Sequence, residues 1–427
     1  MKKKLQFWTL ILTITFVCVG LLPDNGEAIP TFARKYSTSC STCHVAIPKR
    51  NAFGEAFRKL GYRIPGGDAA YVKETPVSLG AEAWKEVWPE GIWPGILPAT
   101  VPISFYGHQR FVWKEDADAS TTFDAPHELE LLIGGNWGDR VSFFGEWILY
   151  EKSYADDRDK LGALYVQFND LLGSKPGMFN VKFGRFETGA ARGHKDDGRL
   201  TPSHPFPYDY KVSGGGADKK LRDKQAGLEV NGILASRFEY ALGIVNGNGS
   251  TADNNSDKDM FYRVGYKFGG MGFDGTGGVP EEELVAADNW RDDSFTIGTF
   301  GYFGKPSDEG TPEENYSRFG FDLRAKYGRL DIGSAIVFGD DEVDGGPDID
   351  STSFFVDAQY LFYPWLIGNV RYGKNDFDNT TQQDVDVVVA NLTILQRANL
   401  RWNVEYFHYL EELGGSDTVK VNFMFAF

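Results

Sequence analysis

Two cysteines and a histidine stand close together near the start of the chain, in the segment Cys40-Ser41-Thr42-Cys43-His44. Cys-x-x-Cys-His is the attachment signature for c-type haem. Two thiols at this spacing can bond the two vinyl groups of one haem, and the adjacent histidine is then placed to bind the iron from the proximal side. We therefore expect one covalently bound haem c, held by Cys40, Cys43 and His44.

A surface disulfide or half of a zinc site is the competing interpretation of the two thiols. A structural zinc site would need two more Cys or His ligands at similar spacing, and the neighbouring sequence has none. The chain has three cysteines, and Cys18 lies in a segment that we expect to be removed. A disulfide between Cys40 and Cys43 would close too small a loop to add much stability, so haem attachment is the preferred interpretation.

The first residues have the pattern of an export signal. Basic residues at 2–4 precede an almost wholly apolar run at 5–22, and a small-x-Ala cleavage pattern ends at Ala28. A retained membrane anchor is the alternative, because the run approaches the length of a spanning helix. Because c-type haem is attached after export, we expect residues 1–28 to be a signal peptide and the mature chain to start at Ile29.

The composition suits a membrane barrel. The chain has 33 Phe, 20 Tyr, 10 Trp and 50 Gly, while no other apolar run is long enough to span a bilayer as a helix. Barrel strands hide their hydrophobicity by alternating apolar and polar residues. The formal net charge of −16 argues against nucleic acid as a partner and fits a surface that attracts cations.

The alternation is visible in the segment 318–327, where successive strand side chains would point to opposite faces. Apolar side chains hold one parity and charged side chains the other: Phe319, Phe321, Leu323, Ala325 and Tyr327 against Arg318, Asp322, Arg324 and Lys326. A soluble protein of two sheets would place the apolar face on a core, whereas a barrel would turn it to outer-membrane lipid. The last segment repeats the pattern, and its terminal Phe427 resembles the carboxy-terminal signal of bacterial outer-membrane proteins.

About sixteen such segments follow residue 100, joined alternately by tight turns and long polar loops. They begin near residues 100, 127, 140, 161, 178, 224, 237, 260, 294, 315, 329, 351, 364, 383, 398 and 417. The stretch 270–293 breaks the alternation, because it is long where a short turn is due. We predict an all-β transmembrane barrel of about 16 antiparallel strands over residues 100–427. An even count places both barrel ends on the short-turn, periplasmic side.

Residues 29–99 would form a small N-terminal α-helical haem domain. Residues 51–60 predict a short helix with one apolar stripe, made by Phe53, Ala56, Phe57 and Leu60. The following run, 71–98, contains Trp84, Trp88 and Trp93. So small a piece buries little core alone, but covalent haem and packing inside the lumen would supply the rest. We expect this domain to sit in, or close, the periplasmic half of the barrel.

Several short motifs carry a family resemblance. They are Ile29-Pro30-Thr31-Phe32-Ala33-Arg34, the Cys-x-x-Cys-His segment, Asn51-Ala52-Phe53-Gly54 with Phe57, and Gly61-Tyr62. Together they resemble the start of the fused monohaem cytochrome–porin family, the outer-membrane cytochromes of iron-oxidising bacteria. The resemblance covers residues 29–62 in motif and the remainder in architecture only. It implies oxidation of extracellular Fe(II) and delivery of electrons to a periplasmic carrier such as a soluble cytochrome, with direction and donor left open.

The distal haem ligand does not follow from the motif. Methionine is the usual partner of histidine in small cytochromes c, but the haem segment has none, since Met178 is the first after Met1. His108 holds the lumen parity of the first strand, so it is our candidate. His127 and His408 fall on the lipid parity of their strands. The other possibilities are His194 and His204 in the loop 188–223, which could fold inward, a lysine, or an open sixth position.

The acidic loops offer a place for a donor. Carboxylates could concentrate Fe(II) at Asp340, Asp341, Glu342, Asp344, Asp348 and Asp350, by electrostatics and hard-oxygen ligation. The alternative is a solvated loop that binds divalent ions of the lipopolysaccharide, or nothing.

The sequence has no catalytic triad, P-loop or dinucleotide fingerprint, so we expect an electron-transfer protein rather than a conventional enzyme. One haem cannot touch both surfaces of a bilayer core about 30 Å thick, so a donor would enter at one mouth and a carrier would dock at the other. The alternatives are the same conduit run outward or with another donor, and a diffusion porin whose haem domain senses or gates. An open pore would conduct ions, which separates the last hypothesis from the others.

Overall fold

The computed structural model describes residues 31–68, 71–75, 77–78, 96–97, 101–115, 120–151, 161–173, 175–191, 199–209, 211, 220–247, 253, 256–278, 290–305, 315–342, 347–378, 384–410 and 415–427. The expected signal peptide, Ile29, the tryptophans at 84, 88 and 93, His194 and Asp344 lie outside these ranges. No helix within them is long and apolar enough to cross a bilayer.

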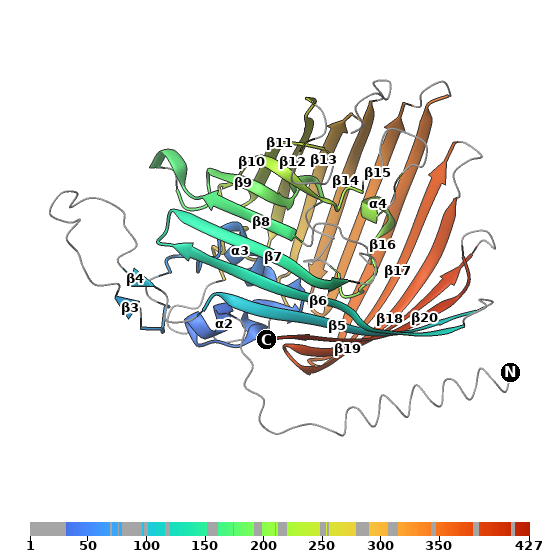
Figure 1. Cartoon of the computed structure of the whole chain (residues 1–427), viewed down its shortest axis with the longest axis horizontal. Coiled ribbons are helices and arrows are strands. Elements are labelled where there is room, and N and C mark those ends of the chain that lie inside the picture. Colours follow the sequence, from blue (N-terminus) through green and yellow to red (C-terminus); the bar gives the residue numbers. More distant parts are fainter. Residues whose placement is uncertain are drawn as a thin grey trace.

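Sixteen antiparallel strands close into one barrel, in which β20 pairs back with β5 (Figure 1). The strands are β5 (Ile103–Lys114), β6 (Thr121–Trp137), β7 (Val141–Glu151), β8 (Leu161–Phe168), β9 (Asn180–Glu187), β10 (Lys224–Leu234), β11 (Phe238–Val245), β12 (Asp259–Gly269), β13 (Ser294–Gly304), β14 (Tyr316–Tyr327), β15 (Leu330–Asp341), β16 (Ile349–Tyr363), β17 (Leu366–Phe377), β18 (Val385–Arg397), β19 (Leu400–Tyr409) and β20 (Thr418–Ala426). The predicted barrel and its strand number are confirmed.

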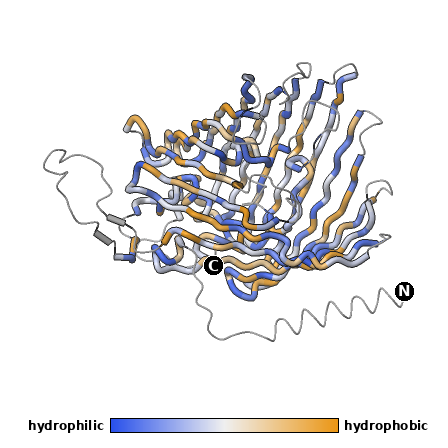
Figure 2. The backbone as a smooth tube through the Cα atoms, viewed as in Figure 1, coloured by the Kyte–Doolittle hydropathy of each residue, from blue (hydrophilic) through white to orange (hydrophobic). Residues whose placement is uncertain are grey.

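The two faces of the wall differ as the alternation predicts. On β14, Arg318 and Asp322 are buried on the lumen side, whereas Phe319 and Phe321 are 37% and 48% exposed on the outside. Figure 2 shows the same alternation of hydrophilic and hydrophobic residues along the other strands. Lumen charges are paired across strands, as where Arg263 on β12 donates to Asp322 at 2.9 Å. A polar interior and an apolar exterior are the arrangement that a barrel needs in lipid.

The residues before the barrel form a small body that we call the plug, residues 31–68 and 71–75. It contains the helix α2 (Thr31–Tyr36), the short 3-10 helix η1 (Cys40–Thr42), the strands β1 (His44–Ala46) and β2 (Lys49–Arg50), and the helix α3 (Ala52–Lys59). Asn51 caps α3 by accepting a hydrogen bond from the backbone of Gly54, as the sequence indicates. Beyond the plug, β3 (Val77–Ser78) pairs with β4 (Ile96–Leu97).

The plug sits in the short-turn end of the barrel and contacts the wall on several sides (Figure 1). Five side-chain contacts join it to β5, β6, the connection after β8, β11 and β15: Thr31–Ser104 at 3.1 Å, Lys35–Asn136 at 2.9 Å, Arg63–Asp170 at 2.8 Å, Lys59–Glu239 at 2.6 Å and Lys49–Asp331 at 2.6 Å. Because these strands lie around the barrel circumference, the plug spans the lumen.

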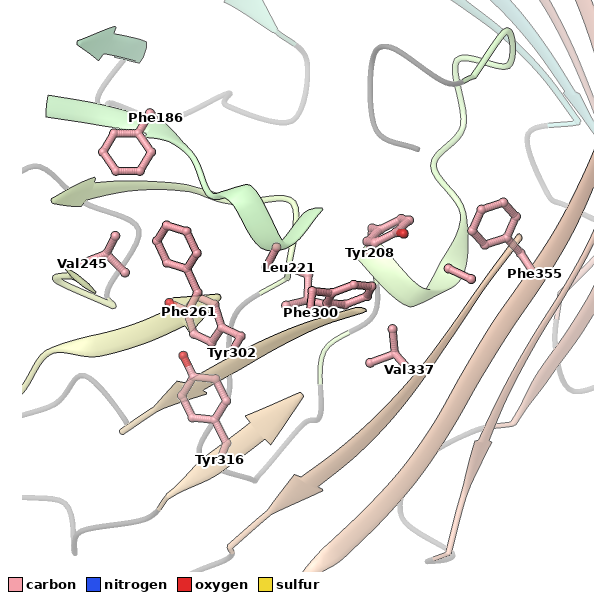
Figure 3. Close-up of a cluster of buried hydrophobic side chains, with 12 residues drawn as sticks. Phe186, Tyr208, Leu221, Val245, Phe261, Phe300, Tyr302, Tyr316, Val337 and Phe355 are labelled. Atoms are coloured by element: carbon pink, nitrogen blue, oxygen red, sulfur yellow. The ribbon is translucent and has the colours of Figure 1, made fainter. Parts of the chain in front are cut away.

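The long connection between β9 and β10 folds into the lumen from the other end. Its described part holds η5 (Gly189–Ala191) and the short helix α4 (Phe206–Asp209). Tyr208 of α4 is fully buried in an aromatic cluster of the barrel interior (Figure 3). Arg401 of the wall donates to the Leu200 carbonyl at 3.1 Å, and Leu200 packs in one cluster with Val45 and Ala46 of the plug. The plug and this infolded loop therefore share a hydrophobic cluster inside the barrel.

Candidate functional site

The Cys-x-x-Cys-His residues lie on one tight turn of the plug. Ser39 caps η1 by accepting from the Ser41 backbone at 3.2 Å, and the Cys43 backbone donates to the Cys40 carbonyl at 3.2 Å. The two thiols are thus about one helical turn apart, and neither is in a disulfide. The turn therefore presents both thiols from the same short element, as attachment to one haem requires.

Helix α3 holds this turn in place. The Asn51 amide donates to the Thr42 carbonyl at 2.9 Å, and the Asn51 backbone donates to the Cys43 carbonyl at 3.0 Å. A Cβ added at Gly54 would overlap the Cys43 carbonyl oxygen, so only glycine lets the helix approach so closely. Asn51 and Gly54 therefore belong to the site as positioning residues, and their role explains why Asn51-x-x-Gly54 follows the cysteine motif.

His44 has a defined ring orientation. Its Nδ1 lies 3.3 Å from the Pro48 carbonyl, and because a carbonyl only accepts, Nδ1 carries the proton. Nε2 is then the ring nitrogen that would bind a metal, the arrangement in which ligating histidines are usually fixed. Burial, followed by the nearby Arg50 charge, lowers the pKa of His44 to about 4, which keeps the ring neutral and suited to ligation.

The surroundings of Cys43 are apolar. Cys43 packs against the plug aromatic cluster, formed by Tyr36, Phe53, Phe57, Tyr62 and Ile64. Burial raises the pKa of the Cys43 thiol to about 12 and also raises that of Cys40. Both thiols are therefore protonated at neutral pH, and an apolar wall lies beside Cys43, as a haem macrocycle would need.

The donor set fits haem better than the alternatives. Within the described ranges, no group of three or more His, Cys, Asp or Glu side chains gathers in a way that could hold a metal ion. The two thiols are separate rather than joined in a disulfide. Two thiols on one turn, an oriented neutral imidazole and an aromatic wall together match covalent haem with a proximal histidine.

The distal candidate His108 lies on the lumen side of β5 and is 2% exposed. Its Nε2 lies 2.8 Å from the Asn422 side-chain oxygen on β20, and its ring centroid lies 4.7 Å from that of His127. These contacts are with the barrel wall rather than with the plug. The role of His108 as a haem ligand stays a prediction.

The expectation for His127 is wrong. Arg110 pairs with Asp124 and His108 pairs with Glu128, so β6 has a bulge of extra residues between them. The bulge lies between two pairs that both face the lumen, and within it the ring of His127 lies against that of His108, with Nδ1 at 2.8 Å from the Asp124 carboxylate. Of the other histidines, His408 is half-exposed beside Asp417 at the end of β19.

His204 lies in the described part of the infolded loop and is partly buried. The acidic segment is also less uniform than its sequence suggests. Asp341 is fully buried, and a carboxylate oxygen lies 2.8 Å from Arg318, so it does not face a donor from solution. Asp340 is exposed, as the loop interpretation requires.

No family model and no curated protein matches the chain. Solved porins do resemble it in structure. OmpF of Salmonella typhi, in a complex with daunomycin, superposes with a TM-score of 0.53 at 12% identity, over 77% of this chain and 98% of that one. The chain has the porin fold. An anion-selective porin from Comamonas acidovorans gives a TM-score of 0.53 at 10% identity, over 76% and 99%. The channel DcaP of Acinetobacter baumannii gives 0.51 at 12%, over 76% and 97%.

Proposed function

We propose that this chain is a monohaem c-type cytochrome fused to a porin-like barrel in the bacterial outer membrane. In this proposal it carries electrons from extracellular Fe(II) to a periplasmic carrier such as a soluble cytochrome. The observation that carries the proposal is the position of the Cys-x-x-Cys-His turn within a plug that spans the lumen. The resemblance of residues 29–62 to the cytochrome–porin family of iron oxidisers suggests Fe(II) as the donor and inward electron flow, and the test below decides both.

The roles of the residues follow from their contacts. Cys40 and Cys43 would bond the haem, and His44, oriented by the Pro48 carbonyl, would be the proximal ligand. The bound group would supply one-electron chemistry. The protein residues supply position and a low dielectric, because the aromatic cluster beside Cys43 excludes water from one side of the site.

The two closures of the lumen favour electron transfer over solute diffusion. The plug contacts the wall around the circumference, through contacts that include the five given above, and Leu200 of the infolded loop shares a hydrophobic cluster with Val45 and Ala46. A diffusion porin with a haem sensor would need a path between these parts. Outward electron flow needs the same residues and remains the closest alternative.

The test is reduction of the oxidised, haem-loaded protein by Fe(II), followed by stopped-flow absorbance. We expect prompt reduction, and then reoxidation by added soluble cytochrome c. The control is the Cys40→Ala/Cys43→Ala variant, which should keep the barrel and lose covalent haem staining. An intact haem that stronger reductants reduce but Fe(II) does not would reject iron oxidation and favour outward transfer or sensing.

A further inference from the structure

One methionine from the barrel reaches the plug. The chain has five methionines, and Met1 belongs to the expected signal peptide. Met178 and Met260 are 39% and 57% exposed, and the sulfur of buried Met424 lies 3.0 Å from Arg401 Nε in the wall. Met271 instead packs against the plug aromatic cluster, the same cluster that Cys43 contacts. A thioether thus packs on the same cluster as Cys43, although the haem segment itself contains no methionine.

Met271 lies on the connection between β12 and β13, which is longer than the other connections at the short-turn end of the barrel. Its described parts, 270–278 and 290–293, are held by hydrogen bonds. The Met271 backbone donates to Asp292 at 2.9 Å, and Ser236 of the neighbouring turn donates to Asp274 at 2.7 Å. The unusual length of this connection therefore serves to bring a structured segment to the plug.

The plug is also fixed to this connection. Lys59 of α3 lies 3.8 Å above the ring of Phe273, and its ammonium pairs with Glu239 at 2.6 Å. These contacts hold α3, and with it the cysteine turn, against the segment that carries Met271. The terminal methyl of Met271 rests on Gly278, which has no side chain to obstruct it. The three rotatable bonds of the Met271 side chain then allow its thioether to turn toward a haem iron.

We propose that Met271 is the distal haem ligand, supplied by the barrel to the haem of the plug. The proposal rests on haem attachment as proposed above, and it replaces His108 in this role. A thioether opposite His44 gives histidine–methionine ligation, which raises the reduction potential relative to histidine on both sides. The ligand is neutral and no proton moves with it. Haem binding would then tie the plug to the barrel by an iron–sulfur bond.

The test is the ligand signature of the purified full chain, loaded with haem. We expect the ferric protein to show the weak long-wavelength band of thioether–iron ligation. In Met271→Leu this band should disappear and the midpoint potential should fall. Met271→His should restore a low-spin spectrum without the band. Met260→Leu and His108→Asn should keep both the band and the potential. Haem staining and heat-modifiable migration on gels verify that each variant is loaded and folded.

A second measurement covers the case in which Met271→Leu fails to fold. Methyl-labelled methionine in the reduced wild-type protein should give one resonance strongly shifted by the haem ring current. That resonance should persist in Met178→Leu, Met260→Leu and Met424→Leu, which leaves Met271 as its source. Absence of the band and of the shifted methyl in the wild type, or their loss in His108→Asn, would overturn the proposal. Failure of Fe(II) to reduce a protein that keeps the band would reject iron oxidation only.

Discussion

At the scale of single residues, the candidate site depends on neighbours that do not themselves touch a cofactor. Asn51 ties the cysteine turn to α3 through two backbone carbonyls, and Pro48 orients the ring of His44. Gly54 allows the close approach between helix and turn. The motif Cys-x-x-Cys-His supplies reactive atoms, whereas these three residues fix where the atoms point.

Gly54→Ala tests the close approach. The added methyl would overlap the Cys43 carbonyl oxygen, so α3 and the turn must separate, at a cost of about 1–3 kcal/mol for overpacking. We expect faster alkylation of Cys43 in the haem-free protein and a lower yield of covalent haem on expression. Gly66→Ala is the control, because its new Cβ would meet nothing, although its φ of +89° is strained. Equal alkylation rates in the two variants would contradict the argument.

Lys49 gives a pH dependence. Burial is the main cause that lowers its pKa to about 8 from 10.5, against the opposing attraction of Asp331. The unfolded chain therefore binds more protons than the folded plug between pH 8 and 10.5, so plug stability rises with pH in that range. We expect Cys43 protection from alkylation to increase across this range relative to Lys49→Met, which lacks the titration. A constant ratio between the two proteins would contradict the assigned pKa.

At the scale of elements, the sequence predicts the barrel well, because a period of two is local information. The expected start of nearly every strand lies within three residues of the observed one, and the helix with its Asn51 cap is confirmed. The main exception is β6, which begins at Thr121 rather than near 127. Within its bulge the strand loses the regular alternation on which the placement of His127 depended.

The alternation of polar and apolar residues could not predict contacts between distant parts of the chain. Nothing local in the stretch 270–293 indicates that it meets a domain two hundred residues earlier in the chain, so its length looked like an irregularity. The same holds for Lys49 and Lys59, because only the closed barrel brings them to their partners Asp331 and Glu239. Composition could place basic residues in the plug, but only the fold pairs them with particular acids.

The junction between plug and wall can be tested at one pair of tyrosines. The hydroxyl oxygens of Tyr62 in the plug and Tyr165 in β8 are 2.7 Å apart. Tyr62→Phe or Tyr165→Phe should each weaken plug docking by about 0.5–1.5 kcal/mol, because one hydrogen bond is lost. The Phe/Phe double variant should cost less than the sum of the single ones, as Cys43 protection against urea would measure. Strict additivity would show that the two hydroxyls do not interact.

At the scale of the whole molecule, the barrel has the porin fold, and two segments of the chain occupy its lumen. The plug enters from the short-turn end, where both barrel termini lie, and the loop between β9 and β10 enters from the other (Figure 1). Basic side chains of the plug meet acids of the wall at three separated places, Asp170, Glu239 and Asp331. These three ion pairs fix the orientation of the plug as well as its position, because each basic side chain pairs with a different acidic residue of the wall.

Ion conductance in a planar bilayer tests whether the docked plug closes the pore. The intact protein should conduct far less than an open porin barrel, because an occupied lumen leaves no continuous water path. The triple variant Lys49→Ala/Lys59→Ala/Arg63→Ala removes three buried ion pairs, each worth about 1.5–3 kcal/mol. We expect it to show frequent opening events, with the infolded loop still limiting the open level. The Cys40→Ala/Cys43→Ala variant should remain closed, since the plug rather than bound haem fills the lumen. A large steady conductance in the intact protein would instead favour a diffusion porin with a haem sensor. The occupied lumen would then no longer be an argument for electron transfer over solute diffusion.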